Sequence, residues 1–154
     1  MAERTIVESM SGTTIAISAS LPATYDAAGY GATSITYTAI EEVESISAHG
    51  LTKAILEFTP VGTGVKTKLP GVKDYGNITV VAGFLPSGAG QDIVRAAAEA
   101  TAHYSLKMTY PDTSIVYLDV IATKDENQNG DIGAVHKVNF EFAICRAPVV
   151  VAQV

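Results

Sequence analysis

The stretch His136-Lys137-Val138-Asn139-Phe140-Glu141-Phe142-Ala143-Ile144 decides the fold class, because apolar and polar residues largely alternate along it. In an extended chain successive side chains point to opposite faces, so this alternation gives the segment one apolar face and one polar face. The pattern predicts a β-strand that packs its apolar face on a hydrophobic core.

Much of the remaining chain has the same strand-like character. Further strands are predicted over residues 13–19, 34–40, 42–47, 52–58, 77–84, 106–110 and 114–123. Both faces of segment 114–123 are apolar, which is typical of a strand that meets the core on one side and a helix or a neighbouring subunit on the other. One helix is predicted over residues 88–102, with Ser87 as its N-cap and Asp92 in its first turn. The chain is therefore expected to be mainly β.

Residues 59–74 differ from the strand-like segments around them. Prolines and glycines interrupt this stretch, and Lys66, Lys68 and Lys73 make it basic within an acidic chain. We predict a long, mobile loop, and loops of this length are usually functional or disordered. The alternative is a solvated surface loop whose lysines serve solubility.

The composition predicts self-assembly. Hydrophobic residues make up 47% of the 154 residues and charged residues only 17%, and the mean hydropathy is +0.24. Globular proteins carry about 25% charged residues, so a single copy would expose apolar surface that further copies can cover. The N-terminal arm, residues 1–12, and the apolar C-terminal tail, residues 147–154, are the expected contacts between subunits. No apolar run is long enough to span a membrane.

Charge and cysteine content exclude other classes of protein. The net charge of −6 argues against a protein that grips nucleic-acid phosphates. The single cysteine, Cys145, excludes an intramolecular disulfide and is predicted to be a small buried core residue. The start of the sequence lacks the apolar run of a secretion signal, so folding in a reducing cytoplasm is expected.

Five short segments follow one another over nearly the whole chain: Ser11-Gly12-Thr13-Thr14-Ile15-Ala16-Ile17-Ser18, Leu21-Pro22-Ala23-Thr24-Tyr25-Asp26, Ile40-Glu41-Glu42-Val43-Glu44-Ser45-Ile46, Tyr75-Gly76-Asn77-Ile78-Thr79-Val80 and Gly90-Gln91-Asp92-Ile93-Val94-Arg95-Ala96-Ala97. In their order and spacing the chain resembles the major tail tube proteins of long-tailed, siphovirus-like bacteriophages with non-contractile tails. The resemblance implies a β-sandwich or barrel with a flanking helix, assembled as hexameric rings that stack into a hollow tube. Such a tube houses the tape-measure protein during assembly and conducts double-stranded DNA from the head.

The resemblance also implies partners and contact residues. The long loop of that family reaches the next ring, and here its lysines would meet acidic residues. The lysines are Lys66, Lys68 and Lys73, and the acidic candidates are Glu41, Glu42 and Glu44. An acidic inner wall would let DNA pass without specific binding, and its candidates are Glu42, Glu44, Asp119 and Glu141. The implied partners are further copies of this chain, the tape-measure protein, and tail terminator and distal tail proteins. No cofactor and no membrane contact are expected, and the location would be the virion tail after assembly in the host cytoplasm.

Motifs for catalysis and metal binding are incomplete. Residues 125–131 begin like a calcium loop, but the twelfth position holds His136 instead of glutamate and the flanks are strand-like. A polar turn with its corner at Asn129-Gly130 is predicted instead. Gly88-Ala89-Gly90 lacks the third glycine of a dinucleotide fingerprint, the three histidines lack metal-ligand spacing, and no G-x-S-x-G is present. No metal and no enzymatic activity are expected.

Two other functions are compatible with the sequence. A tube subunit of a headless, phage-tail-like bacteriocin or of a secretion system would share this physics and differ only in its cargo. A monomeric β-sandwich could instead bind sugar or calcium through residues 125–131. Its oligomeric state would separate it from a tube subunit.

Overall fold

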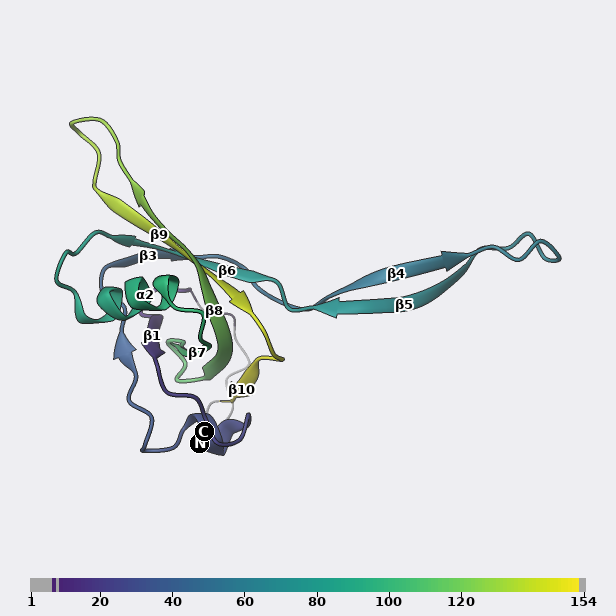
Figure 1. Cartoon of the computed structure of the whole chain (residues 1–154), viewed down its shortest axis with the longest axis horizontal. Coiled ribbons are helices and arrows are strands. Elements are labelled where there is room, and N and C mark those ends of the chain that lie inside the picture. The colour runs from purple at the N-terminus through teal and green to yellow at the C-terminus, as the bar shows by residue number, and fades with distance from the viewer. Residues whose placement is uncertain (1–6, 8, 153–154) are drawn as a thin grey trace.

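A computed structural model describes residue 7 and residues 9–152, and shows a β-rich body from which a two-stranded arm extends (Figure 1). In order along the chain, its strands are β1 (Thr14–Ser18), β2 (Thr38–Ala39), β3 (Val43–Ile46), β4 (Thr52–Phe58), β5 (Thr67–Asp74), β6 (Asn77–Gly83), β7 (Tyr104–Thr109), β8 (Ile115–Gln128), β9 (Lys137–Ile144) and β10 (Val149–Val151). The helices in this part of the chain are α1 (Ala27–Tyr30) and α2 (Ala89–Glu99). The prediction of a mainly β fold with a flanking helix is confirmed. Most of the predicted N-terminal arm falls outside the described residues.

The strands of the body form one antiparallel sheet in the order β2-β1-β7-β8-β9-β6-β3, with β10 paired to the beginning of β8. The alternation that predicted β9 places Val138, Phe140 and Phe142 in the core, each fully buried. Inward residues of β1, β6, β7 and β8 join them in one hydrophobic cluster. Burial of this shared face holds the body together.

Helix α2 covers the core from the side of β8, β1 and β2. Its fully buried Val94 and Ala97 belong to the hydrophobic cluster. The helix spans 11 residues, and its N-cap is Gly88 rather than the predicted Ser87. Within the described residues, no helix is long and apolar enough to cross a membrane.

Strand β8 is buried on both faces, as its sequence predicts. Leu118 and Val120 point into the core, and Tyr117 on the other face stacks on Tyr30 of α1 with ring centres 5.2 Å apart. The Tyr37 hydroxyl donates a hydrogen bond to the Tyr30 carbonyl at 3.0 Å. Burial raises the pKa of Tyr30 to about 12, so the ring stays neutral. Helix α1, which the sequence did not predict, thus covers the second face.

The arm is a continuation of the β3–β6 pair. Beyond β3, the Ser47 N–H still donates to the Thr79 carbonyl at 2.9 Å. After a short interruption, the two segments that continue from β3 and lead into β6 pair again as β4 and β5. The predicted loop over residues 59–74 is therefore wrong in its second half, because Thr67–Asp74 is β5 and only residues 59–66 connect the strands. Proline is tolerated here because both strands of an isolated pair are edge strands. Gly71 lies at the irregular part of the ladder, where a Cβ would approach the Ala54 carbonyl oxygen to 2.9 Å.

A second hairpin extends where β8 and β9 continue beyond the body (Figure 1). Their pairing runs on from Lys124 opposite Glu141 to Gln128 opposite Lys137. Residues 125–128, predicted as part of a polar turn, thus belong to a strand. The β8 side chains in this extension, residues 123–128, are exposed, so no hydrophobic alternation marks this end of the strand in the sequence.

Candidate functional site

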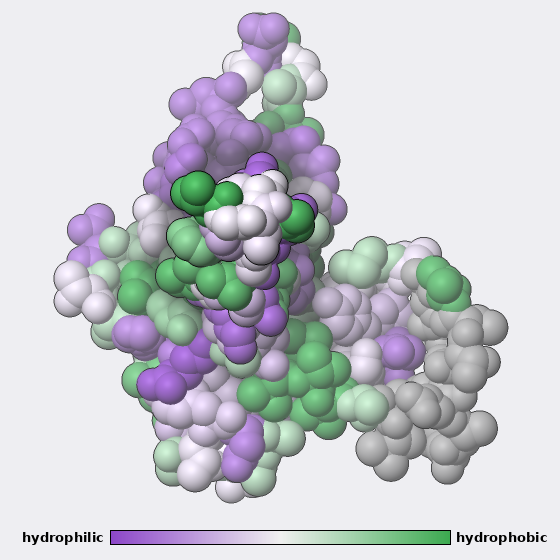
Figure 2. Space-filling view, turned by 90° about the vertical axis from the view of Figure 1, so that its right-hand side faces the viewer, coloured by the Kyte–Doolittle hydropathy of each residue, from purple (hydrophilic) through white to green (hydrophobic). Residues whose placement is uncertain are grey.

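One face of the arm is apolar and uncovered. Leu56 lies opposite Leu69, and Phe58 lies two residues from Leu56 on the same face. The exposed fractions of these side chains are 57% for Leu56, 50% for Leu69 and 62% for Phe58. Figure 2 looks onto the tip of the arm and shows apolar side chains lying open to solvent there.

The other face of the arm is basic. Lys68 lies opposite Glu57, and Lys73 lies directly opposite Lys53. Lys66, at the end of the connecting loop, forms an ion pair with Glu57 at 3.1 Å. Like charges that face each other across a strand pair are unfavourable, so the Lys53–Lys73 pair would be stabilised by an acidic partner. All three lysines predicted for an inter-ring contact are therefore on the arm.

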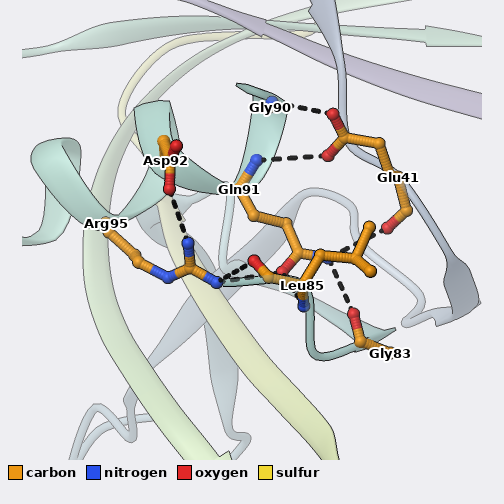
Figure 3. Close-up of polar contacts among 7 residues, drawn as sticks. All are labelled: Glu41, Gly83, Leu85, Gly90, Gln91, Asp92 and Arg95. Carbon is orange, nitrogen blue, oxygen red and sulfur yellow. Dashed lines mark hydrogen bonds and ion pairs between the residues drawn. The ribbon is translucent and has the colours of Figure 1, made fainter. Parts of the chain in front are cut away.

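Glu41 caps helix α2 (Figure 3). Its Oε1 accepts a hydrogen bond from the Gly90 N–H at 3.1 Å, and its Oε2 accepts one from the Gln91 N–H at 3.4 Å. Gly88, the N-cap, has no side chain to do this, so the carboxylate satisfies N–H groups that the first turn leaves unpaired. Burial raises the pKa of Glu41, but backbone hydrogen bonds led by that of Gly90 outweigh burial, and the pKa lies below its usual value. The carboxylate thus has partners within its own chain, and the inter-ring contact predicted for Glu41 stays a prediction.

Gln91 and Arg95 of α2 bind the turn before β3 and the loop before α2, which we call the corner (Figure 3). The fully buried Gln91 side chain donates to the Glu41 carbonyl at 3.1 Å and to the Gly83 carbonyl at 2.8 Å, and accepts from the Leu85 N–H at 3.1 Å. Arg95 donates to the Leu85 carbonyl at 2.8 Å. These bonds hold the turn before β3 and the loop before α2 against the helix. The sequence offered no signal for this network, because its partners are distant along the chain.

Glu42 and Glu44 lie beside this corner and are exposed. Glu42 occupies the turn before β3 with a φ of 56°, a left-handed conformation uncommon outside glycine. Among the described residues Glu42 has no ion-pair partner, whereas Glu44 pairs with Lys137 at 2.7 Å. A hollow of about 250 Å³ separates these two acids from Val135 on the β8–β9 hairpin. Both carboxylates can meet a partner from outside the chain.

Asp119 does not lie on an open surface, so its predicted outward position is wrong. Its side chain is only 1% exposed and accepts a hydrogen bond from the Arg146 Nε at 3.1 Å. The His103 Nδ1 lies 3.1 Å from its other oxygen. Arg146 also stacks over the ring of Tyr25 at 3.8 Å. The second face of β8 is covered by these groups and by α1, which the alternation along β8 could not reveal.

Glu141 lies on the outer face of the sheet. It accepts a hydrogen bond from Asn77 at 2.9 Å and lies 4.0 Å from the Lys124 Nζ. Lys137, the ion-pair partner of Glu44, is four residues away on β9 and therefore on the same face. Glu44 and Glu141 thus share a sheet face, and each has a lysine beside it.

The sequence also makes predictions for Cys145 and for the apolar tail, residues 147–154. Cys145 is exposed rather than buried, because β9 ends at Ile144. The predicted apolar tail contains β10, which pairs with β8 of the same chain and leaves Val150 exposed. Within residues 9–152 and residue 7, no group of three or more histidine, cysteine or acidic residues is placed to hold a metal ion.

No protein-family model matches this chain, and no curated protein matches it in sequence. Its fold, however, matches solved structures of tail tubes and related assemblies. A chain of the SPP1 tail tube aligns with a TM-score of 0.61 at 9% identity, over 92% of this chain and 77% of that one. A chain of the tail of an empty gene transfer agent particle, refined with C6 symmetry, aligns with a TM-score of 0.62 at 15% identity, over 90% of this chain and 96% of that one. This chain has a tail tube fold.

The tail tube fold also occurs outside phage tails. A chain from the sheath/tube terminator structure of an extracellular contractile injection system aligns with a TM-score of 0.68 at 11% identity, over 96% of this chain and 98% of that one. The fold therefore does not single out the non-contractile tail that the sequence predicts. It agrees with the predicted tail tube type of fold.

Proposed function

We propose that this protein is a structural subunit that assembles with its own copies into stacked hexameric rings forming a hollow tail tube. The observation that carries the proposal is the β4–β5 arm, whose apolar face has no cover in a single copy. An isolated two-stranded hairpin is at best marginally stable in water, so this arm is expected to pack on another subunit. The C6 symmetry of the gene transfer agent tail supports rings of six.

The contacts within the proposed tube follow from the exposed charges. Lys66 and Lys68, nearer the tip of the arm, would meet Glu42 and Glu44 of a subunit in the next ring, whereas Lys73, paired with Lys53 at the base of the arm, would lie outside this contact. A charged contact of this kind sets register and orientation more than affinity. The tail around β10 and the N-terminal residues 1–12 are proposed to contact neighbouring subunits.

The proposed channel conducts double-stranded DNA without binding it specifically, because acidic residues on its wall repel phosphate. Glu141 is the wall candidate that best keeps this role, since Asp119 is buried and Glu42 and Glu44 lie near the corner that can meet an arm. The proposed partners are a tape-measure protein inside the tube and terminator and distal tail proteins at its ends. The proposed location is the tail of a virion, assembled in the host cytoplasm.

A second candidate is the tube of a phage-like injection system, bacteriocin or secretion system. The fold match to an extracellular contractile injection system favours it. It shares the arm and the ring and differs in cargo, so the presence or absence of DNA in native particles separates the two.

Removal of the arm tests the proposal. Thr52 and Asp74 are directly paired, so residues 53–73 can be replaced by the two-residue turn Asn-Gly, which suits a hairpin. The purified wild-type chain is expected to form tubes in electron micrographs at high concentration. The armless chain is expected to stay folded, with a cooperative thermal unfolding transition, and to form rings that no longer stack. A wild-type chain that stays monomeric, or armless chains that form normal tubes, would overturn the proposal.

A further inference from the structure

We infer that the tip of the arm of one copy docks into a groove at the opposite end of the next copy. This inference rests on the proposed function and adds the surface that receives the arm. The groove lies between the beginning of β3 and the β8–β9 hairpin, where hollows of about 250 and 300 Å³ share Val135 and Lys137. We call it the receiving groove, and its other lining residues are Glu42, Glu44, Gly83, Gln128, Asn129, Gly130 and Ala134.

The arm and the receiving groove point in opposite directions. In Figure 1 the arm leaves the body on the right, while β3 begins and the β8–β9 hairpin projects on the left. Two copies placed in line along the arm therefore bring the tip of one to the groove of the other. Such a head-to-tail contact uses two different surfaces and can repeat without limit along an axis.

The two surfaces match in apolar character. Val61 and Val65 at the tip of the arm are exposed, and so are Ile132 and Val135 on the β8–β9 hairpin. Both sets of side chains are open to solvent in a single copy. Contact between the tip and the groove would remove both from water, which favours association.

The two surfaces also match in charge. The arm from Thr52 to Asp74 carries four lysines against two acidic residues, whereas Glu42, Glu44 and the hairpin segment 124–137 together carry five acidic residues against two lysines. Among the described residues, neither Lys68 nor Glu42 has an ion-pair partner in its own chain. The charges therefore favour the tip in the groove over an arm packed on another arm.

The receiving groove is held in shape before any partner arrives. The turn that presents Glu42 is fixed by the contacts of Gln91 with the Glu41 and Gly83 carbonyls. On the hairpin side, His136 stacks on Phe84 with ring centres 4.3 Å apart. A preformed surface loses less conformational entropy on binding.

A charge exchange within the full chain tests the inference. Lys66→Glu with Lys68→Glu is expected to abolish tubes, and adding Glu42→Lys with Glu44→Lys to the same chain is expected to restore them. The matched control carries Lys53→Glu and Lys73→Glu, the same charge change at the base of the arm. When Glu42→Lys and Glu44→Lys are added to this control, tubes are expected to be lost, because Lys66 and Lys68 at the tip would then face lysines in the groove.

Cross-linking tests the same contact by proximity. In a Cys145→Ser background, Val61→Cys with Val135→Cys is expected to give a ladder of oligomers with a short bis-maleimide, whereas Val72→Cys with Val135→Cys is not. The inference would be overturned, and the proposed function would stand, if the wild-type chain forms tubes but Glu42→Lys with Glu44→Lys does not restore them in the Lys66→Glu, Lys68→Glu chain and no ladder appears. Failure of the wild-type chain to form tubes would overturn the proposed function, and the inference with it.

Discussion

The carboxylate of Glu41 accepts the N–H of Gly90 at 3.1 Å, across 49 residues of sequence. The contact is possible because α2 begins in direct contact with β2, where a Cβ on residue 90 would lie 2.0 Å from the Ala39 carbonyl oxygen. Only glycine allows this approach. One corner thus fixes the start of the helix and the turn that carries Glu42.

We expect Glu41→Ala to destabilise the fold. The variant leaves the N–H groups of Gly90 and Gln91 without their acceptor, and loss of a helix cap lowers the free energy of unfolding by about 1–2 kcal/mol. Urea unfolding at neutral pH measures this. The control is Glu57→Ala, which removes an exposed carboxylate on the arm and should cost less than about 0.5 kcal/mol. Equal losses in the two variants would contradict a capping role.

The same carboxylate should make stability depend on pH. The pKa of Glu41 lies below its ordinary value of 4.5, so its stabilising contribution is present above the pKa of the unfolded chain and is lost as pH falls through the folded pKa. Between about pH 7 and pH 3, wild-type stability should therefore fall more steeply than that of Glu41→Gln. Parallel curves from urea unfolding would show that this group is not responsible.

Gly90→Ala should be among the most damaging single substitutions. The added methyl group would overlap the backbone of Ala39, and because backbone cannot move aside as a side chain does, we expect a loss of about 3 kcal/mol. Gly133→Ala is the matched control, since nothing lies within 4 Å of a Cβ there. Thermal melting of both variants decides the matter, and a wild-type melting temperature for Gly90→Ala would refute the close packing.

The core could be predicted from the sequence because a strand with one buried face carries apolar residues at every second position. In β9 the buried Val138, Phe140 and Phe142 follow one another at every second position. The end of β8, residues 123–128, and the strand β5 lie outside the core and are largely exposed in a single copy, so no such pattern is required of them. Prolines and glycines were then the strongest local signal, and they predicted a loop where a ribbon forms.

The candidate site was harder to predict because neighbouring acidic residues look alike in a sequence. Glu41 and Glu42 are adjacent, yet one caps a helix and the other is exposed. Asp119 stands at a polar position of a strand, which predicts exposure. Its partners His103 and Arg146 come from distant segments, and only the folded chain brings them together.

Asp119→Asn tests whether this carboxylate is structural. The neutral side chain weakens the hydrogen bonds with Arg146 and His103, and we expect the free energy of unfolding to fall by about 2 kcal/mol. Glu141→Gln, on the outer face of the sheet, should change it by less than about 0.5 kcal/mol. Chemical unfolding of the two variants compares them directly. An unchanged stability for Asp119→Asn would show that the charge of this carboxylate is not needed to hold Arg146 and His103 in place.

The two faces of the arm should differ in their importance for assembly. Leu56→Thr with Leu69→Thr makes the apolar face polar and introduces β-branched residues, which suit a strand pair. Since both leucines are half-exposed in a single copy, the free energy of unfolding should stay within about 0.5 kcal/mol of wild type, whereas sedimentation and electron microscopy should show no tubes. Ile55→Thr makes the same kind of change on the basic face, where the side chain is also exposed, and tubes should persist. If the double variant assembles like wild type while Ile55→Thr does not, then the basic face carries the contact and the apolar face lies outside it.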